Sequence, residues 1–164
     1  MQKEGFEAVA ILNNIRSIQN VASMFRTADG AGINKIYLTG ITSSPLDRFG
    51  KPLQPFAKVS LGAEKSVPWE KVQRAGALTK KLKKDGYHIV AVEQHEKAVR
   101  FDKFDPRKHK KIAILMGEEV RGIPAPLIKL CDAVLEIPMR GKKESLNVSV
   151  AFGVASYAIT RTLE

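Results

Sequence analysis

Three short segments hold the polar residues whose types and spacing could do chemistry. The segment IPMRGKKESLN ends with Ser145 and Asn147, directly before a long apolar stretch that suits a buried helix. Free backbone N–H groups and the helix dipole favour hydrogen-bond acceptors at a helix N-terminus. We therefore interpret Ser145 and Asn147 as polar groups at the mouth of a candidate binding site.

The segment LMGEEVRGIP surrounds two acidic residues with glycines. Gly117 ends an apolar run, and Gly122 precedes a further apolar stretch. A glycine at the end of a strand lets a ligand approach the backbone closely. Taken alone, the pattern suits an ordinary strand-to-helix turn equally well.

The segment NVASMFRTADGAG places Arg26 six residues after Asn20 in a half-apolar stretch. Composition alone favours a surface arginine paired with an acid. Other chemistries lack their residues: no Cys/His spacing suits zinc, and no Ser-His-Asp set occurs. A nucleotide- or NAD-dependent enzyme is disfavoured, because the glycine patterns that bind phosphates are missing.

The bulk composition points to a polyanionic partner. The 164 residues contain 27 Lys and Arg against 17 Asp and Glu, a formal net charge of +10. Such a positive field attracts nucleic acid. The single cysteine, Cys131, cannot form an internal disulfide, which fits a reducing cytoplasm, and no targeting or transmembrane segment is visible. We expect a single domain over residues 1–164.

The elements that must position the three segments alternate between strands and helices. This alternation predicts an α/β fold with a mostly parallel sheet flanked by helices. Ligands bind at the carboxyl ends of parallel strands, and the polar and glycine-rich residues follow those ends. The expected strands are 6–12, 35–39, 87–92, 112–116 and 133–137; the expected helices are 20–29 with Asn20 as N-cap, a short turn at 57–61, 69–84, 123–130 and one from Ser145 onward.

The last of these helices is apolar or small on nearly every face from Leu146 to Ile159. A helix that is apolar all round is buried on several sides, and at about 15 residues it is too short to span a membrane. We expect it inside the fold, at a subunit interface, or both.

Together the three segments resemble the motifs of SPOUT-class RNA methyltransferases, in the TrmH-like branch of ribose 2′-O-methyltransferases. The family pattern is an Asn followed six residues later by Arg, then a strand running into G-x-E-x-x-G, and last I-P-M-x-G followed by S-L-N-V-S. Order and separations agree over essentially the whole chain, with Ala22 as one departure where many members carry Gly. The matching residues are Asn20, Arg26, Gly117, Glu119, Gly122, Ile137, Pro138, Met139, Gly141, Ser145, Leu146, Asn147, Val148 and Ser149.

The resemblance implies a C-terminal deep trefoil knot, an obligate homodimer and methyl transfer from S-adenosyl-L-methionine without a metal. The product would be S-adenosyl-L-homocysteine, and the acceptor a ribose 2′-hydroxyl of tRNA or rRNA. Two alternatives stay open: a non-catalytic RNA-binding module of the same knotted fold, and methylation of a base nitrogen.

The resemblance also implies roles for individual residues. Family members use this Arg as a general base, but an arginine with a pKa above about 12 is a poor base at neutral pH. We therefore expect Arg26 to clamp the phosphate beside the target ribose and stabilise charge, and a base role through a strongly lowered pKa stays open as the alternative. Asn20 would position the hydroxyl or the arginine, and Glu119 would fix its loop by accepting backbone hydrogen bonds. Ser145 and Asn147 would orient the ribose or the methionine end. The expected catalytic residues are Arg26, Asn20, Asn147, Ser145 and Glu119; those for the cofactor are Val92, Glu93, Gly117, Ile137, Met139, Ser145 and Leu146; the basic residues for RNA are Arg48, Lys51, Lys58, Arg121, Arg140, Lys142 and Lys143.

Overall fold

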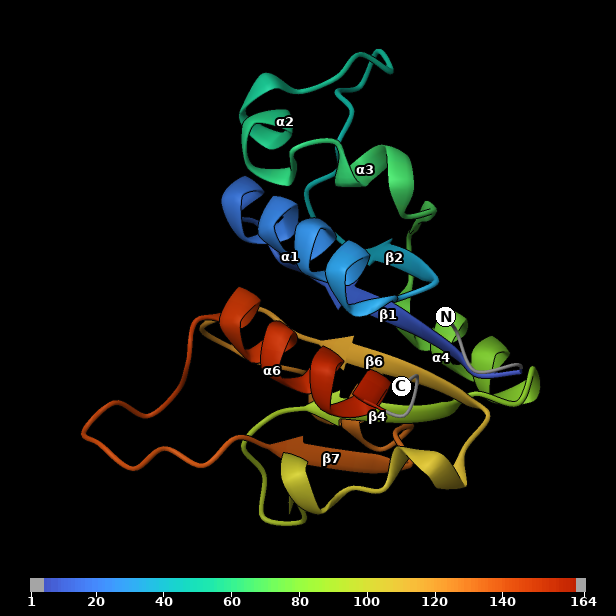
Figure 1. Ribbon diagram of the computed structural model, residues 1–164, viewed down its shortest axis with the longest axis vertical. Helices are drawn as coiled ribbons and strands as arrows, with labels where there is room; N and C mark the ends of the chain where they lie inside the picture. The colour runs from blue at the N-terminus through green and yellow to red at the C-terminus, as the bar shows by residue number, and fades with distance from the viewer. Residues whose placement is uncertain (1–4, 162–164) are drawn as a thin grey trace.

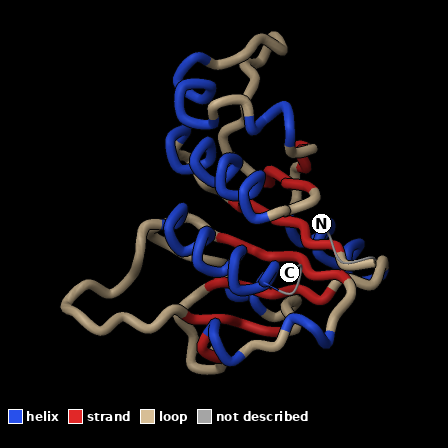
Figure 2. The backbone as a smooth tube through the Cα atoms, in the orientation of Figure 1, coloured by secondary structure: helices blue, strands red, loops and turns tan. Residues whose placement is uncertain are grey.

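A seven-stranded sheet with helices on both faces forms the centre of the computed structural model, which describes residues 5–161 (Figure 1, Figure 2). Every pairing between neighbouring strands is parallel, in the order β3-β2-β1-β6-β4-β7-β5. The predicted α/β class with a mostly parallel sheet is therefore confirmed. The strands are β1 (Glu7–Asn13), β2 (Lys35–Thr39), β3 (Trp69–Val72), β4 (His88–Val92), β5 (Val99–Arg100), β6 (Lys111–Met116) and β7 (Ala133–Glu136); the helices are α1 (Ile18–Ala31), α2 (Gln54–Ser60), α3 (Ala63–Ser66), α4 (Ala75–Lys84), α5 (Ala125–Ile128) and α6 (Val148–Thr160), with 3₁₀ turns η1 (Phe101–Lys103) and η2 (Pro106–Lys108).

Alternate residues of each inner strand enter one of two cores. In β1, Ala10 and Leu12 join the core under α1 and α6, whereas Val9 and Ile11 join the core under α4 and α5. Burial on both faces explains why this strand is almost entirely apolar. The two cores hold the sheet rigid, so that the loops at the strand ends have fixed starting points.

Helices α1 and α6 lie side by side on one face of the sheet (Figure 1). Phe152 and Ile159 of α6 are fully buried, whereas Val150 and Tyr157 are 50% and 55% exposed. In a single chain, α6 is thus buried on one side and exposed to solvent on the other. No helix within residues 5–161 combines the length and apolar character needed to cross a membrane.

Several predicted element boundaries were wrong. The expected helix over 69–84 is the edge strand β3 followed by α4, because Trp69 pairs with Ile36 of β2 and this pairing overrides the helical spacing of the apolar residues. Ser17, and not Asn20, caps α1, since its hydroxyl accepts the backbone N–H of Asn20.

Shorter differences affect the remaining elements. The turn expected at 57–61 is helix α2, and the helix expected over 123–130 is the four-residue α5. Residues 94–111, whose polar sequence predicts a connection between two strands, contain β5, η1 and η2. Helix α6 begins at Val148, three residues later than predicted, because Asn147 is its N-cap and has non-helical backbone angles.

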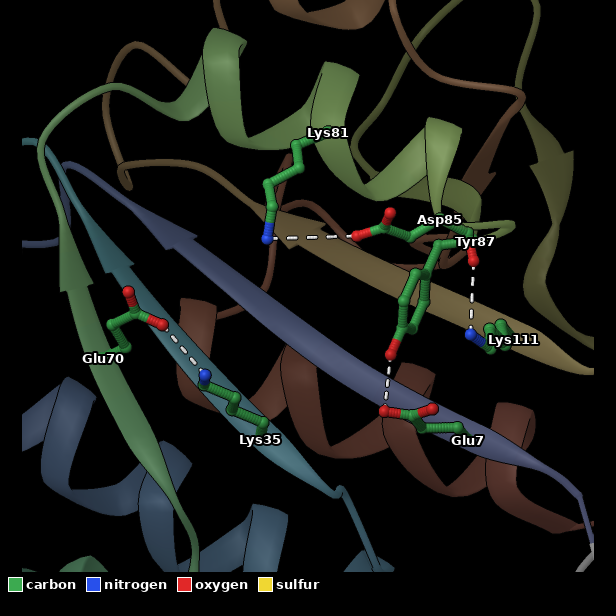
Figure 3. A network of polar contacts seen from close by, with 7 residues as sticks. All are labelled: Glu7, Lys35, Glu70, Lys81, Asp85, Tyr87 and Lys111. Atoms are coloured by element: carbon green, nitrogen blue, oxygen red, sulfur yellow. Dashed lines mark hydrogen bonds and ion pairs between the residues drawn. The ribbon is translucent and has the colours of Figure 1, made fainter.

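The amino ends of the strands carry a network of structural polar contacts (Figure 3). Lys35 of β2 pairs with Glu70 of β3 at 2.9 Å, and the Tyr87 hydroxyl donates to the Glu7 carboxylate at 2.5 Å. Burial and then the Glu7 contact raise the pKa of Tyr87, so it stays a neutral donor. This edge is closed by side chains that bond to one another, whereas the glycine-rich loops lie at the opposite edge.

Candidate functional site

A cleft of about 940 Å³ opens at the carboxyl ends of β4, β6 and β7, beside the start of α6. This is the edge at which the sequence predicted a site. The ends of β1 and β2 do not contribute to it, because Asn13 and Thr39 are buried and hydrogen-bonded to each other at 2.9 Å. The cleft is lined by six of the seven residues expected to bind the cofactor, namely Val92, Glu93, Gly117, Ile137, Ser145 and Leu146, whereas Met139 is not among its lining residues.

The segment 118–122, which we call the glycine turn, forms one wall of the cleft. Its backbone closes through the Gly122 N–H donating to the Glu118 carbonyl at 3.0 Å. A Cβ atom at Gly117 would lie 2.6 Å from the Gly122 carbonyl carbon, and Gly122 has a φ of 66°. Both glycines are therefore required by the local backbone: one by close approach, the other by its left-handed conformation.

Glu93 holds the glycine turn against the end of β4. Its Oε2 accepts the Ile123 N–H at 3.0 Å, and its Oε1 accepts the Gln94 N–H at 3.1 Å. The Glu93 carboxylate thus positions the cleft wall, a contact that the sequence did not reveal.

The opposite wall comes from the segment 137–147, which we call the C-terminal loop and which projects from the sheet between β7 and α6 (Figure 1). The Gln94 side chain donates to the Glu144 carbonyl at 2.5 Å and ties this loop to the end of β4. Gln94 was missed because a polar residue after a strand carries no signal of a partner 50 residues away.

Asn147 joins α6 to the rest of the site. Its Oδ1 accepts the backbone N–H groups of Ser149 and Val150 at 2.9 and 3.4 Å, and its Nδ2 donates to Asn20 Oδ1 at 3.2 Å. Asn20 in turn donates to Glu119 Oε1 at 2.5 Å. Three of the five expected catalytic residues therefore form one chain of hydrogen bonds that connects α6, α1 and the glycine turn.

Glu119 differs in detail from the expectation. It accepts from the Asn20 side chain, whereas Glu118 accepts the backbone N–H of Arg121 at 3.3 Å. The backbone contact that was expected of Glu119 is thus made by its neighbour.

Arg26 lies apart from these residues. It is exposed on α1 and is not among the residues that line the cleft. Six positions separate it from Asn20, which in a helix means about 9 Å along the axis and about 120° around it. The structure therefore brings Asn20, Glu119, Asn147 and Ser145 to the cleft or its border, but not Arg26 of the same chain.

Basic side chains lie around the site and beyond it. All seven residues expected to bind RNA are exposed. Arg121 belongs to the glycine turn, and Arg140, Lys142 and Lys143 belong to the C-terminal loop. Arg48 and Lys51 lie between β2 and α2, and Lys58 lies on α2.

Cys131 also borders the cleft, where burial raises the pKa of its thiol to about 11. The thiol is protonated at neutral pH, so it packs and does not act as a nucleophile. Among residues 5–161, no three His, Cys, Asp or Glu side chains are arranged to hold a metal ion.

Comparison with known proteins gives a consistent family. The model of the SpoU rRNA Methylase family matches residues 7–157. A protein of Staphylococcus haemolyticus that carries the name of a TrmH family tRNA/rRNA methyltransferase is 31% identical over 159 residues, which cover 97% of this chain and 60% of the relative. The chain thus spans about 60% of the length of such curated relatives.

Solved structures agree in fold. The S-adenosylmethionine-bound rRNA methyltransferase from Sinorhizobium meliloti superposes with a TM-score of 0.87 at 26% identity, covering 100% of this chain and 59% of that one. The A. aeolicus TrmH/SpoU tRNA modifying enzyme gives a TM-score of 0.82 at 26% identity, covering 98% and 77%.

Proposed function

The chain belongs to the SpoU rRNA methylase family, and on that premise we propose that it transfers a methyl group from S-adenosyl-L-methionine to a ribose 2′-hydroxyl of tRNA or rRNA. The observation that carries the proposal is the cleft between the glycine turn and the C-terminal loop, with the Asn20–Glu119–Asn147 hydrogen bonds at its border.

The residues that line the cleft fit a nucleoside-sized cofactor. The volume of the cleft lies within the usual range for small-molecule sites, about 300–1,000 Å³. Backbone groups at Gly117, Ile137 and Leu146 would hold the adenosine part, with Val92 and Glu93 beside them. Ser145 lies on the same wall and would orient the methionine end or the ribose. The cofactor supplies a methyl group that its sulfonium already activates, so the protein has to hold the acceptor oxygen in line and assist proton removal.

The position of Arg26 supports a homodimer. Val150 and Tyr157 of α6 are exposed apolar side chains, and Gly30 of α1 lies directly beneath the Tyr157 hydroxyl. A second copy packed on this α1–α6 face would cover them. It would also bring Arg26 of the partner subunit toward the cleft that its own chain does not reach. There it would bind the phosphate next to the target ribose and stabilise charge on the hydroxyl oxygen.

A charged surface would draw the RNA to this face. Contacts from Arg121, Arg140, Lys142 and Lys143 to phosphates release counterions, so affinity should fall by at least tenfold between about 50 and 200 mM salt. The deep trefoil knot and a cytoplasmic location stay predictions that go with this proposal.

The variant Arg26→Ala tests the proposal. We expect methyl transfer to tRNA or rRNA to be abolished, while calorimetry shows nearly unchanged affinity for S-adenosylmethionine. Equal loss of cofactor affinity would contradict the assigned role. Nuclease digestion and mass spectrometry of the RNA treated with the unmodified chain then locate the methyl group, and a methylated base would replace the ribose proposal. RNA binding by the unmodified chain without any methyl transfer would favour a non-catalytic RNA-binding module.

A further inference from the structure

Phe49 is an exposed aromatic residue that does not line the cleft. Its side chain is 73% exposed, in the segment between β2 and α2. A single exposed apolar residue is common on soluble proteins and needs no explanation by itself. Two features of its surroundings set Phe49 apart.

The first feature is a fixed backbone. Residues 46–52 form a hairpin that is closed by an antiparallel bridge between Leu46 and Pro52. The Asp47 carboxylate accepts the Phe49 N–H at 2.8 Å and the Lys51 N–H at 3.0 Å. The backbone N–H of Asp47 donates to the Lys51 carbonyl at 2.8 Å. The ring is therefore displayed on a structured tip, which lowers the entropy cost of using it in binding.

The second feature is positive charge beside the ring. The Arg48 guanidinium lies 4.7 Å from the centre of the Phe49 ring, and Lys51 is exposed two residues further on. The one acid of the tip, Asp47, is turned toward backbone N–H groups. An aromatic face between cations is the combination with which proteins bind unpaired nucleotides, because the ring stacks on the base and the cations attract the phosphates.

We propose that Phe49 stacks on an unpaired nucleobase of the bound RNA, with Arg48 and Lys51 on the flanking phosphates. This inference rests on the proposed function, because it needs RNA as the partner. It adds that the RNA carries a single-stranded nucleotide at this place, since bases inside a duplex do not offer a face for stacking.

The stacked base would belong to another nucleotide of the same RNA and not to the methylated nucleotide itself. The hairpin lies beyond α2 at one end of the molecule, whereas the strands β4, β6 and β7 that carry the cleft lie toward the other end (Figure 1). Edge-to-face packing of Phe25 on Phe56, with ring centres 5.3 Å apart, fixes α2 on α1. The hairpin therefore acts as a second, rigidly placed contact that helps to select which RNA is bound.

The test compares the full chain with three variants, Phe49→Ala, Phe49→Leu and Phe49→Trp, and with Ile41→Ala as a control. Ile41 is 53% exposed in the same segment but aliphatic. The probes are a single-stranded oligoribonucleotide of about 12 nucleotides, the same strand with abasic sites, and unfractionated tRNA. Affinity is measured by fluorescence anisotropy, and the oligomeric state by light scattering.

We expect Phe49→Ala and Phe49→Leu to weaken binding of the base-bearing strand by about 5- to 150-fold. Phe49→Trp and Ile41→Ala should bind within about twofold of the unmodified chain. On the abasic strand the difference in affinity between the unmodified chain and the Phe49→Ala variant should vanish, because only the phosphate contacts remain.

Three results would overturn the stacking role. Equal affinity of Phe49→Ala and the unmodified chain for the base-bearing strand would do so, as would a Phe49→Leu variant that binds normally, since an aliphatic side chain cannot stack. A change in oligomeric state without a change in RNA affinity would make Phe49 a protein contact instead. If the unmodified chain binds neither tRNA nor the oligoribonucleotide, the proposed function itself is contradicted. If the unmodified chain binds tightly and Phe49→Ala has no effect on affinity, only the stacking inference is contradicted.

Discussion

Replacing Gly122 by Ala should loosen the glycine turn through two separable costs. The first is conformational, because Gly122 has a φ of 66° and a Cβ atom in the left-handed region costs about 1–2 kcal/mol. The second comes from contact, since the new Cβ would lie 2.2 Å from Glu93 Oε2. That oxygen is the end of a flexible side chain and can rotate away. Moving it sacrifices its hydrogen bond from the Ile123 N–H, worth about 1.5–3 kcal/mol for a charged acceptor.

The two costs sum to about 2.5–5 kcal/mol of unfolding free energy. They can be separated by making Gly122→Ala in the unmodified chain and in a Glu93→Ala background, with urea unfolding as the assay. In the second background only the conformational cost of about 1–2 kcal/mol should remain, so the coupling between the two sites should be about 1.5–3 kcal/mol. Calorimetry should show S-adenosylmethionine affinity reduced at least tenfold for Gly122→Ala, because Glu93 and Gly122 both line the cleft.

Gly76→Ala is the matched control. A Cβ atom there meets nothing within 4 Å, and the position lies in α4, so the change should be neutral or stabilise by about 0.5–1 kcal/mol. An equal destabilisation by Gly122→Ala with and without Glu93 would refute the reasoning, because the carboxylate would then not be what the new methyl group displaces.

Contacts elsewhere in the molecule support three further predictions. Gly117→Ala should be more damaging than Gly122→Ala, since its Cβ would lie 2.6 Å from backbone that cannot rotate away; thermal unfolding of both variants side by side checks the order. Asn147→Ser should keep the α6 cap, within about 1 kcal/mol, yet lose methyl transfer because the bond to Asn20 is gone; a variant of normal stability and normal activity would contradict this. Burial, and then the neighbouring His109, lower the pKa of His88 from 6.5, so the folded chain binds fewer protons there than the unfolded chain. This stability contribution is complete above about pH 6.5 and is lost as the pH falls through the lowered pKa of His88; urea unfolding from pH 8 to 5 should therefore show a shallower decline for His88→Gln than for the unmodified chain.

The sheet could be predicted from sequence wherever a strand is buried on both faces. The apolar runs of β1, β2 and β6 have no competing interpretation, and their boundaries agree with the structure within about one residue. Strand β3 was missed because Trp69, Val72, Ala75 and Leu78 also fit helical spacing, and only the pairing with β2 decides between the two.

The candidate site was predictable in its parts but not in its connections. Glu93 and Gly117 could be placed at the cleft, because the carboxyl ends of parallel strands converge. The bond from Asn147 to Asn20 joins residues 127 positions apart, and no local pattern encodes it. Met139 was expected at the cofactor by motif alone, whereas the backbone of the C-terminal loop leaves it outside the cleft lining.

The strand order has a consequence for how the protein is made. Strand β6 lies between β1 and β4, so that Glu7 pairs with Lys111. The part of the cleft lining that comes last in the chain is formed by Val148 and Ala151 of α6. A nascent chain still attached to the ribosome therefore has no cleft until α6 has emerged, however much of the sheet has already formed. A ligand of the cleft can therefore stabilise only the final step of assembly, and a chain that terminates before Asn147 lacks the part of the cleft lining that α6 supplies.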